Sequence, residues 1–187
     1  IQNYETVSEG TFQGNTTITN IVFGTGVVTL SYVIHYAPNL VSITIGPDVT
    51  TIGSLVGYAE KLTTITLDSG NTTFYVDNDI LYKKVGANNK HTLVQYPIGK
   101  APATFSIPAT VVIIQDQAAF SSNITTLEVP ASVTTIGHES FMGSASLDTV
   151  TFASSGSVLV SIGRQAFQYT ALLSIEIPAS VTSNEPL

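Results

Sequence analysis

Apolar residues recur along the chain in one unit: an apolar residue, two variable residues, then an apolar, a variable and an apolar residue. The alternation inside each unit predicts a short strand with one buried face. Successive copies begin at residues 18, 40 and 62, then at 124, 147 and 172, so most steps are 22 to 25 residues. This period is typical of a solenoid. The copies are Ile18, Ile21, Phe23; Leu40, Ile43, Ile45; Leu62, Ile65, Leu67; Ile124, Leu127, Val129; Leu147, Val150, Phe152; Leu172, Ile175, Ile177; and, less complete, Phe105 and Ile107.

A second element follows each strand. After Val129 the chain reads PASVTTIGHESF, up to Phe141, and related strings follow Ile107 and Ile45. The pattern predicts a turn begun by Pro or Gly, a second short extended segment, and a tight helical or 3-10 turn whose Ala and Phe point inward. No single coil can bury its apolar residues alone, so the coils must stack. We therefore expect a mainly β solenoid with a curved parallel sheet.

The residues from Val129 to Phe141, with those from Leu147 to Phe152, resemble the BspA-like (treponemal-type) leucine-rich repeat, whose string is close to I-P-x-S-V-T-x-I-G-x-x-A-F followed by x-x-L-x-x-I-x-I. The resemblance spans residues 15–182 and implies a leucine-rich-repeat solenoid. The Cys that commonly follows the Phe in this family is absent, with Asn123, Gly143 and Tyr169 nearby instead, and the first coil is degenerate at Gly24–Val27.

We expect one solenoid over residues 1–187, with about seven coils, an N-terminal cap region at 1–17 and an incomplete C-terminal coil. The period is interrupted between Leu67 and Ile107, which are 40 residues apart. Alternating aromatic and apolar residues flank two turn sequences, Asp77-Asn78-Asp79 and Gly86 to Asn89. This pattern predicts an inserted antiparallel β-meander at 70–101 that projects from the solenoid. Similar inserts are known in the family that the chain resembles.

The balance of six basic and 13 acidic side chains, a net charge of −7, argues against a nucleic-acid partner. The most apolar stretches are too short to span a bilayer, so we expect no direct membrane insertion in this segment. Because Cys is absent, disulfides, thiolate metal sites and a Cys nucleophile are excluded.

Candidate catalytic and metal-binding residues are few. His35, His91 and His138 have no partner at a catalytic spacing, and we expect them to be solvent-exposed; Glu139 adjoins His138, but neighbours in an extended segment point to opposite faces. Asp77 and Asp79 suit a plain turn better than a weak metal site, because the other ligands of a calcium loop are missing. No catalytic or nucleotide motif is present. We expect no enzyme activity, no cofactor and no metal.

The stacked strands predict a row of outward side chains between the apolar ones. The row is rich in hydroxyl groups and faintly acidic, and lacks the Trp, Tyr and Arg of most protein hot spots. Its candidate contact residues are Thr64, Thr66, Glu128, Thr149 and Glu176; a solvated β face is the alternative. The whole row is Asn20, Val22, Ser42, Thr44, Thr64, Thr66, Thr104, Ser106, Thr126, Glu128, Thr149, Thr151, Ser174 and Glu176.

The insertion offers richer chemistry. Tyr75 and Tyr82 with Lys83 and Lys84 form a candidate anchor for a glycan ring or an acidic protein surface. The alternative is that these aromatic residues pack the insertion onto the solenoid.

The resemblance implies a setting outside the cell, because BspA-like repeats are typically found on bacterial or protist surfaces and are linked to adhesion. We expect a non-catalytic cell-surface or secreted recognition module for a host extracellular protein or glycan. A structural spacer within a larger surface protein is the alternative. Binding to ice is a remoter one, disfavoured by the irregular repeat steps.

Overall fold

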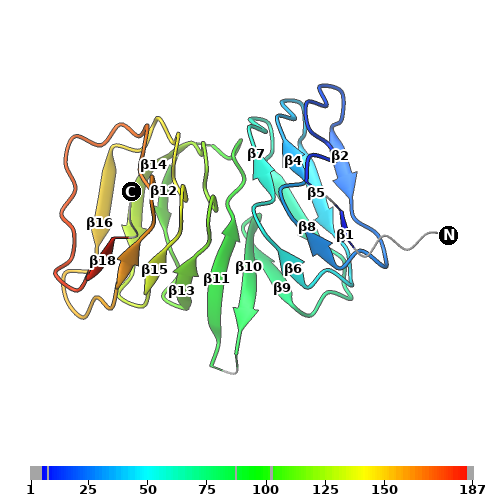
Figure 1. Cartoon of the computed structure of the whole chain (residues 1–187). Helices are drawn as coiled ribbons and strands as arrows, with labels where there is room; N and C mark the ends of the chain where they lie inside the picture. The colour runs from blue at the N-terminus through cyan, green and yellow to red at the C-terminus, as the bar shows by residue number, and fades with distance from the viewer. Residues whose placement is uncertain (1–5, 8, 87, 102, 185–187) are drawn as a thin grey trace. The chain divides into compact units, whose positions relative to one another are not determined.

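The computed structural model describes residues 6–7, 9–86, 88–101 and 103–184, and all regular secondary structure among them is β (Figure 1). Residues 1–5 and 8 of the expected cap, Ala87 of the expected turn at 86–89, Pro102 and the last three residues lie outside this description. The chain divides into two compact units: unit 1 comprises 1–84 with 94–100, and unit 2 comprises 85–93 with 101–187.

Unit 1 is built from parallel strands that stack one repeat on the next. Ile21, Ile43 and Ile65 occupy matching positions in three strands and are buried, as the repeat predicted. The strands form three sheets: β2 (Asn20–Val22), β5 (Ser42–Ile45) and β8 (Thr64–Leu67); β1 (Thr6–Val7), β3 (Thr29–Leu30) and β6 (Thr51–Ile52); and β4 (Ile34–His35) with β7 (Val56–Gly57).

Unit 2 repeats this arrangement. Phe105, Leu127 and Val150 are in register in one parallel sheet, and Leu127, Ile136 and Phe141 are fully buried. One sheet contains β12 (Ala103–Ser106), β14 (Ile124–Val129) and β16 (Thr149–Phe152). A second row of strands, joined by parallel pairs in this order, contains β11 (Lys90–Gln95, of which 90–93 belong to this unit), β13 (Val111–Ile114), β15 (Thr135–Ile136), β17 (Ser161–Ile162) and β18 (Ser183–Asn184).

The segments expected to be helical are linked β-turns, and no helix forms among the described residues. Gln117 and Ser121 have φ of 56° and 54°, in the left-handed region, which a right-handed helix excludes. Alternate N–H groups of this turn donate to carbonyls of the next coil: Gln117 N to His138 O (2.9 Å), Ala119 N to Ser140 O (2.7 Å) and Ser121 N to Met142 O (2.8 Å). Hydrogen bonds between coils thus replace those of a helix.

Glycine allows neighbouring coils to approach closely at the Ile-Gly pairs. A Cβ added to Gly137 would lie 2.5 Å from the backbone N of Asp116, and one added to Gly163 would lie 2.5 Å from that of His138. Backbone therefore touches backbone at these two positions, and no side chain fits between the coils.

The insertion begins with an antiparallel pair, β9 (Phe74–Asp77) and β10 (Ile80–Val85), which confirms the predicted change from parallel stacking. Asn78 and Asp79 join the strands at φ of 48° and 65°, the two positive angles of a type I′ turn. Phe74 and Leu81 are buried in the core of unit 1. The hairpin is therefore packed against the solenoid, and the expectation that it projects was wrong.

The last expected strand, Leu172–Ile177, is absent. The sheet of β12 and β14 ends at β16, and Leu173 is fully exposed. A hollow lined by residues 150–157 and 176–180 separates β16 from this segment.

Candidate functional site

The two tyrosines expected to bind a partner lie opposite each other in β9 and β10. The rings of Tyr75 and Tyr82 are stacked, with centroids 5.0 Å apart and an interplanar angle of 14°. Tyr82 is only 1% exposed, whereas Tyr75 is half-buried. Burial, followed by the proximity of Tyr75 and Asp77, raises the pKa of Tyr82 well above its usual value. Tyr82 therefore supports the hairpin from inside, and Tyr75 presents the accessible ring.

The two expected lysines of the insertion are held by backbone oxygens. Lys83 Nζ donates to Thr50 O (3.0 Å) and lies 5.7 Å from the ring centre of the buried Phe74. Lys84 Nζ donates to Thr72 O (3.1 Å), and its residue is exposed. Lys84 beside the half-buried Tyr75 is thus the more accessible of the two cations.

The outward row of unit 1 has the expected register, with Thr64 and Thr66 at its end on β8. Its polar groups bond to one another along the stack: Ser42 Oγ donates to Asn20 Oδ1 (2.7 Å), and the hydroxyls of Thr44 and Thr66 are 2.9 Å apart. Side chains at paired positions of neighbouring strands are close enough to form such hydrogen bonds.

In unit 2 the row places Glu128 on β14 and Thr149 on β16. Ser106 Oγ donates to Glu128, and Thr149 Oγ1 donates to Asp148 (2.8 Å). Glu176 is exposed but lies outside any strand, so the sheet does not hold it in the row. The structure thus presents the predicted residues in two separate groups, Thr64 with Thr66 and Glu128 with Thr149.

The two aspartates of the insertion have partners of their own. Asp79 forms an ion pair with Lys100 (3.2 Å), and Asp77 accepts a hydrogen bond from Asn78 (3.2 Å). Among the described residues, no three His, Cys, Asp or Glu side chains group as metal ligands. Asp77 is therefore engaged within the turn, and Asp79 ties the turn to Lys100.

The expectation that all three histidines are exposed was wrong for His91. Its side chain is buried on β11, and its Nδ1 lies 2.9 Å from Thr110 Oγ1. In a strand with one exposed face, every second side chain would be exposed. In β11, every residue from 91 to 95 is buried. A strand covered on both faces explains why a polar residue there is internal.

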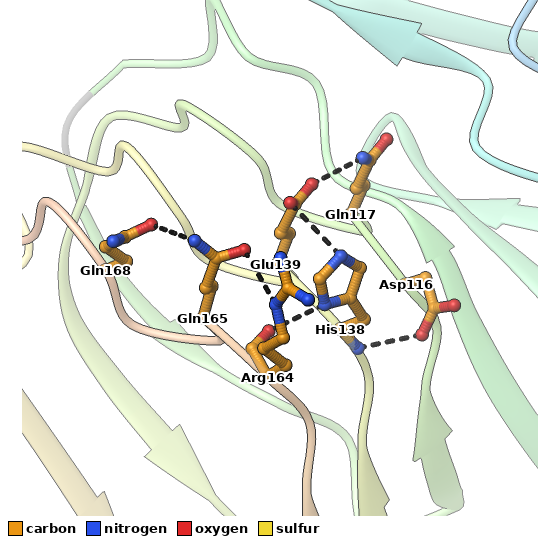
Figure 2. Close-up of polar contacts among 7 residues, drawn as sticks. All are labelled: Asp116, Gln117, His138, Glu139, Arg164, Gln165 and Gln168. Atoms are coloured by element: carbon orange, nitrogen blue, oxygen red, sulfur yellow. Dashed lines mark hydrogen bonds and ion pairs between the residues drawn. The ribbon is translucent and has the colours of Figure 1, made fainter. Parts of the chain in front are cut away.

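A polar cluster that the sequence did not predict joins three coils of unit 2 (Figure 2). His138 Nε2 lies 3.1 Å from Glu139 Oε1, and Gln117 Nε2 donates to Glu139 Oε2 (2.7 Å). His138 Nδ1 lies 2.8 Å from Arg164 O, and the backbone N of His138 donates to Asp116 (2.8 Å). Both ring nitrogens face oxygen acceptors, so a ring that carries both protons donates to each.

The expectation that His138 and Glu139 point to opposite faces was wrong. Glu139 has φ of 51°, and a left-handed residue breaks the alternation of an extended segment. His138 and Gln117 of the same cluster contact the two oxygens of Glu139, and the cluster contains no nucleophile. This arrangement suits a role in holding neighbouring coils together.

Exposed aromatic residues on the turns of unit 1 were also missed. In one coil, Tyr32 lies between β3 and β4, His35 is the last residue of β4, and Tyr36 follows it. In the next coil, Tyr58 follows β7. The rings of His35 and Tyr58 meet edge to face, 5.2 Å apart at 72°. We call these four residues the turn-tyrosine patch. The 22-residue step from Tyr36 to Tyr58 was its signal in the sequence.

Two hollows border the sheet of β12, β14 and β16. The larger, of about 630 Å³, is lined by residues 150–157 and 176–180; the smaller, of about 280 Å³, lies over Ser106, Glu128 and Thr151. Within the described part of the chain, no helical segment has the length and hydropathy to cross a membrane.

The fold is similar to that of solved bacterial proteins. The pneumococcal vaccine antigen PcpA aligns with 90% of this chain at a TM-score of 0.77 and 19% identity, and a leucine-rich cell surface protein from Faecalibacterium prausnitzii aligns with 88% at 0.62 and 24%. A leucine-rich repeat protein from Bacteroides capillosus aligns with 60% at 0.53 and 28%, over 88% of its own length. The chain spans 41% of the first structure and 55% of the second.

No curated protein matches the chain. The family model of the BspA type leucine rich repeat region, however, matches in six copies over residues 1–82 and 101–186, with a gap that falls inside the insertion. The match covers most of the sequence, and the stacked parallel coils agree with it. The chain therefore belongs to the BspA-type leucine-rich repeat family.

Proposed function

We propose that this chain is a non-catalytic recognition module on a cell surface or in a secreted protein, which binds an extracellular host protein or a glycan. The family supports a repeat module, and two proteins of similar fold are described as a vaccine antigen and a cell surface protein. The net charge of −7 disfavours nucleic acid as the partner.

The observation that carries the proposal is the arrangement of Tyr75. Its ring is supported from below by the buried Tyr82, so it is held in place before a partner arrives. A rigid amphipathic ring loses little conformational entropy on binding. Lys84 is exposed and lies two residues along β10 from Tyr82, on the hairpin face of Tyr75, so one positive charge accompanies the ring in an otherwise acidic chain. Lys83 lies on the opposite face, beside Phe74.

The two groups of the outward row are secondary contacts in this proposal. Thr64 and Thr66 in unit 1, and Glu128 and Thr149 in unit 2, offer hydroxyl and carboxylate oxygens to a polar partner, as does the exposed Glu176. Their hydrogen bonds within the chain limit the affinity that each can add.

A second candidate function is that of a spacer. It is favoured by the way polar side chains bond to neighbouring coils, as Ser42 does to Asn20 and Thr44 to Thr66. Such bonds stabilise the stack and leave the row with few groups to offer a ligand.

The test is a binding screen of the chain against immobilised extracellular-matrix proteins and a glycan array, with an acidic protein of similar charge as control. For a ligand that binds specifically and saturably, the double variant Tyr75→Ala/Lys84→Ala should bind at least about tenfold more weakly. The control is Tyr169→Gly/Lys90→Ala, which likewise removes one Tyr and one Lys, both exposed and outside the β9–β10 hairpin. Equal binding by both double variants would contradict the insertion site, and failure of the whole screen would favour the spacer.

A further inference from the structure

The turn-tyrosine patch exposes aromatic rings on one wall of unit 1. Tyr32, Tyr36 and Tyr58 are 46%, 55% and 40% exposed. The backbone N of Tyr36 donates to Gly57 O (2.9 Å), and that of Tyr32 donates to Ser54 O (2.7 Å), so two adjacent coils are tied together at these residues. Strands in register lie about 4.8 Å apart, which places Tyr36 and Tyr58 side by side.

The backbone at these tyrosines is unfavourable for a large side chain. Tyr32, Tyr36 and Tyr58 have φ of 49°, 59° and 52°. On the preceding coil the corresponding residues are Gly10 and Gly14, whose N–H groups donate to Tyr32 O and His35 O. Glycine adopts positive φ without steric cost, whereas other residues rarely do. Turns of other coils also hold non-glycine residues at positive φ, such as Gln117 and Glu139, so this conformation belongs to the repeat, and the exposed aromatic rings are what distinguish these positions.

The glycines also leave space on the preceding coil, next to the patch. A Cβ added to Gly14 would meet nothing within 4 Å, so the preceding coil has space at the position next to Tyr36. Near Gly10, the Gln13 Oε1 atom lies 3.0 Å from the position of an added Cβ. The surface of the preceding coil is therefore uncrowded at Gly14, and the amide side chain of Gln13 lies close to Gly10.

The chemistry of the patch is aromatic, polar and uncharged. Residues 31–37 and 55–59 contain no Asp, Glu, Lys or Arg; Glu60 and Lys61 follow the second segment, and Lys61 Nζ donates to Asn39 Oδ1 (2.7 Å). Each of the four rings carries a hydrogen-bonding atom: three phenol oxygens and the imidazole nitrogens of His35. The aliphatic residues of the two segments, Val33, Ile34, Leu55 and Val56, are buried.

We infer that the turn-tyrosine patch binds a neutral glycan. The apolar C–H face of a sugar ring stacks on the exposed faces of Tyr36 and Tyr32, while its hydroxyl groups exchange hydrogen bonds with the phenols and with His35. This inference rests on the proposed recognition function and assigns it a ligand class at a second site, separate from Tyr75 and Lys84.

The same residues disfavour other ligands. Nucleic acids and anionic glycans require Lys or Arg, which the two segments lack. An apolar peptide requires an aliphatic floor, and the aliphatic residues here face inward. A sugar ring needs only flat aromatic faces with polar groups beside them.

The experiment is a glycan array probed with the whole chain, followed by titration of each retained oligosaccharide. Isothermal titration calorimetry measures the affinity of the wild type and of each variant without using the patch tyrosines as reporters. The test variant is Tyr32→Gly/Tyr36→Gly/Tyr58→Gly, which removes the rings and relieves the strained backbone. The matched control is Tyr169→Gly, at φ of 58° and 70% exposed in unit 2.

We expect neutral oligosaccharides to be retained with little dependence on salt, binding to weaken at least about tenfold in the triple variant, and the control to bind as the wild type does. Retention of anionic glycans alone, no retained glycan, or unchanged affinity in a folded triple variant would overturn the inference. If matrix proteins still bind through Tyr75 and Lys84 in any of these cases, the proposed function stands without this site. If nothing binds in either experiment, the proposed function fails as well.

Discussion

Phe141 and Phe167 occupy the same position in successive coils, and their rings stack with centroids 5.5 Å apart and an interplanar angle of 5°. Phe141 is fully buried, whereas Phe167 is half-buried. We predict that Phe141→Ala lowers the free energy of unfolding by about 3 to 5 kcal/mol, because it removes apolar contact and leaves a cavity. Urea denaturation measures this change, and Phe167→Ala should cost less. A loss well below about 1 kcal/mol for Phe141→Ala would contradict its place in the core.

Close contact of coils at Gly163 leads to a second prediction. Gly163→Ala places a Cβ 2.5 Å from the backbone N of His138, which cannot move without disturbing its hydrogen bond to Asp116. We expect a loss of about 1 to 3 kcal/mol in the free energy of unfolding. Gly24→Ala is the control, since an added Cβ there meets nothing within 4 Å and should change stability by less than about 1 kcal/mol. Equal effects of the two substitutions would argue against backbone contact between the coils.

The buried Tyr82 predicts how stability depends on pH. Its pKa is raised in the folded chain, chiefly by burial, above the value of about 10 in the unfolded chain. As pH rises, the unfolded state therefore releases this proton first. The contribution of the protonated Tyr82 to folding stability is complete below pH about 10 and is lost as pH rises through the folded-state pKa. Urea denaturation at pH 8 and at pH 11 measures this effect. The free energy of unfolding should fall between the two pH values in the wild type, and should fall by less in Tyr82→Phe. An identical fall in both proteins would show that Tyr82 ionises as freely as in the unfolded chain.

The left-handed backbone at Tyr36 supports a fourth prediction. Tyr36→Gly should change the free energy of unfolding by less than about 1 kcal/mol, since relief of strain offsets the lost contacts of the ring. Tyr36→Val should cost about 1 to 3 kcal/mol, because a β-branched residue tolerates φ of 59° poorly. Thermal unfolding of the two variants, compared with the wild type, provides the measurement. If Tyr36→Val were as stable as Tyr36→Gly, the left-handed conformation would be in doubt.

Much of the fold could be predicted because the repeat leaves a strong pattern. Ile21, Ile43 and Ile65 are spaced by 22 residues and occupy one register in the sheet. The conformation of the turns could not be predicted in this way. Tyr36 and Glu139 adopt positive φ because the next coil supplies hydrogen-bond acceptors, and this requirement is not visible within one repeat.

The candidate site was predicted less completely, for a related reason. Alternation in a strand cannot distinguish Tyr75, which is half-buried, from Tyr82, which lies opposite it and is buried. Burial depends on what covers each face of the hairpin, and that is decided by tertiary packing. The contact of His138 with Glu139 was missed because their spacing implied opposite faces, whereas the backbone at Glu139 turns the carboxylate back.

The hydrogen bonds between turns have a consequence for how such proteins change length. Gly14 donates to the coil that contains Tyr36, and Tyr36 donates in the same way to the coil that contains Gly57. Each coil therefore donates backbone N–H groups to the coil that follows it, and its own carbonyls accept the N–H groups of the coil before it. A whole coil that is gained or lost would keep this direction of backbone donation at the junction, because each coil of a solenoid contacts chiefly its two neighbours. Repeat number becomes a variable that selection can adjust while the architecture stays constant.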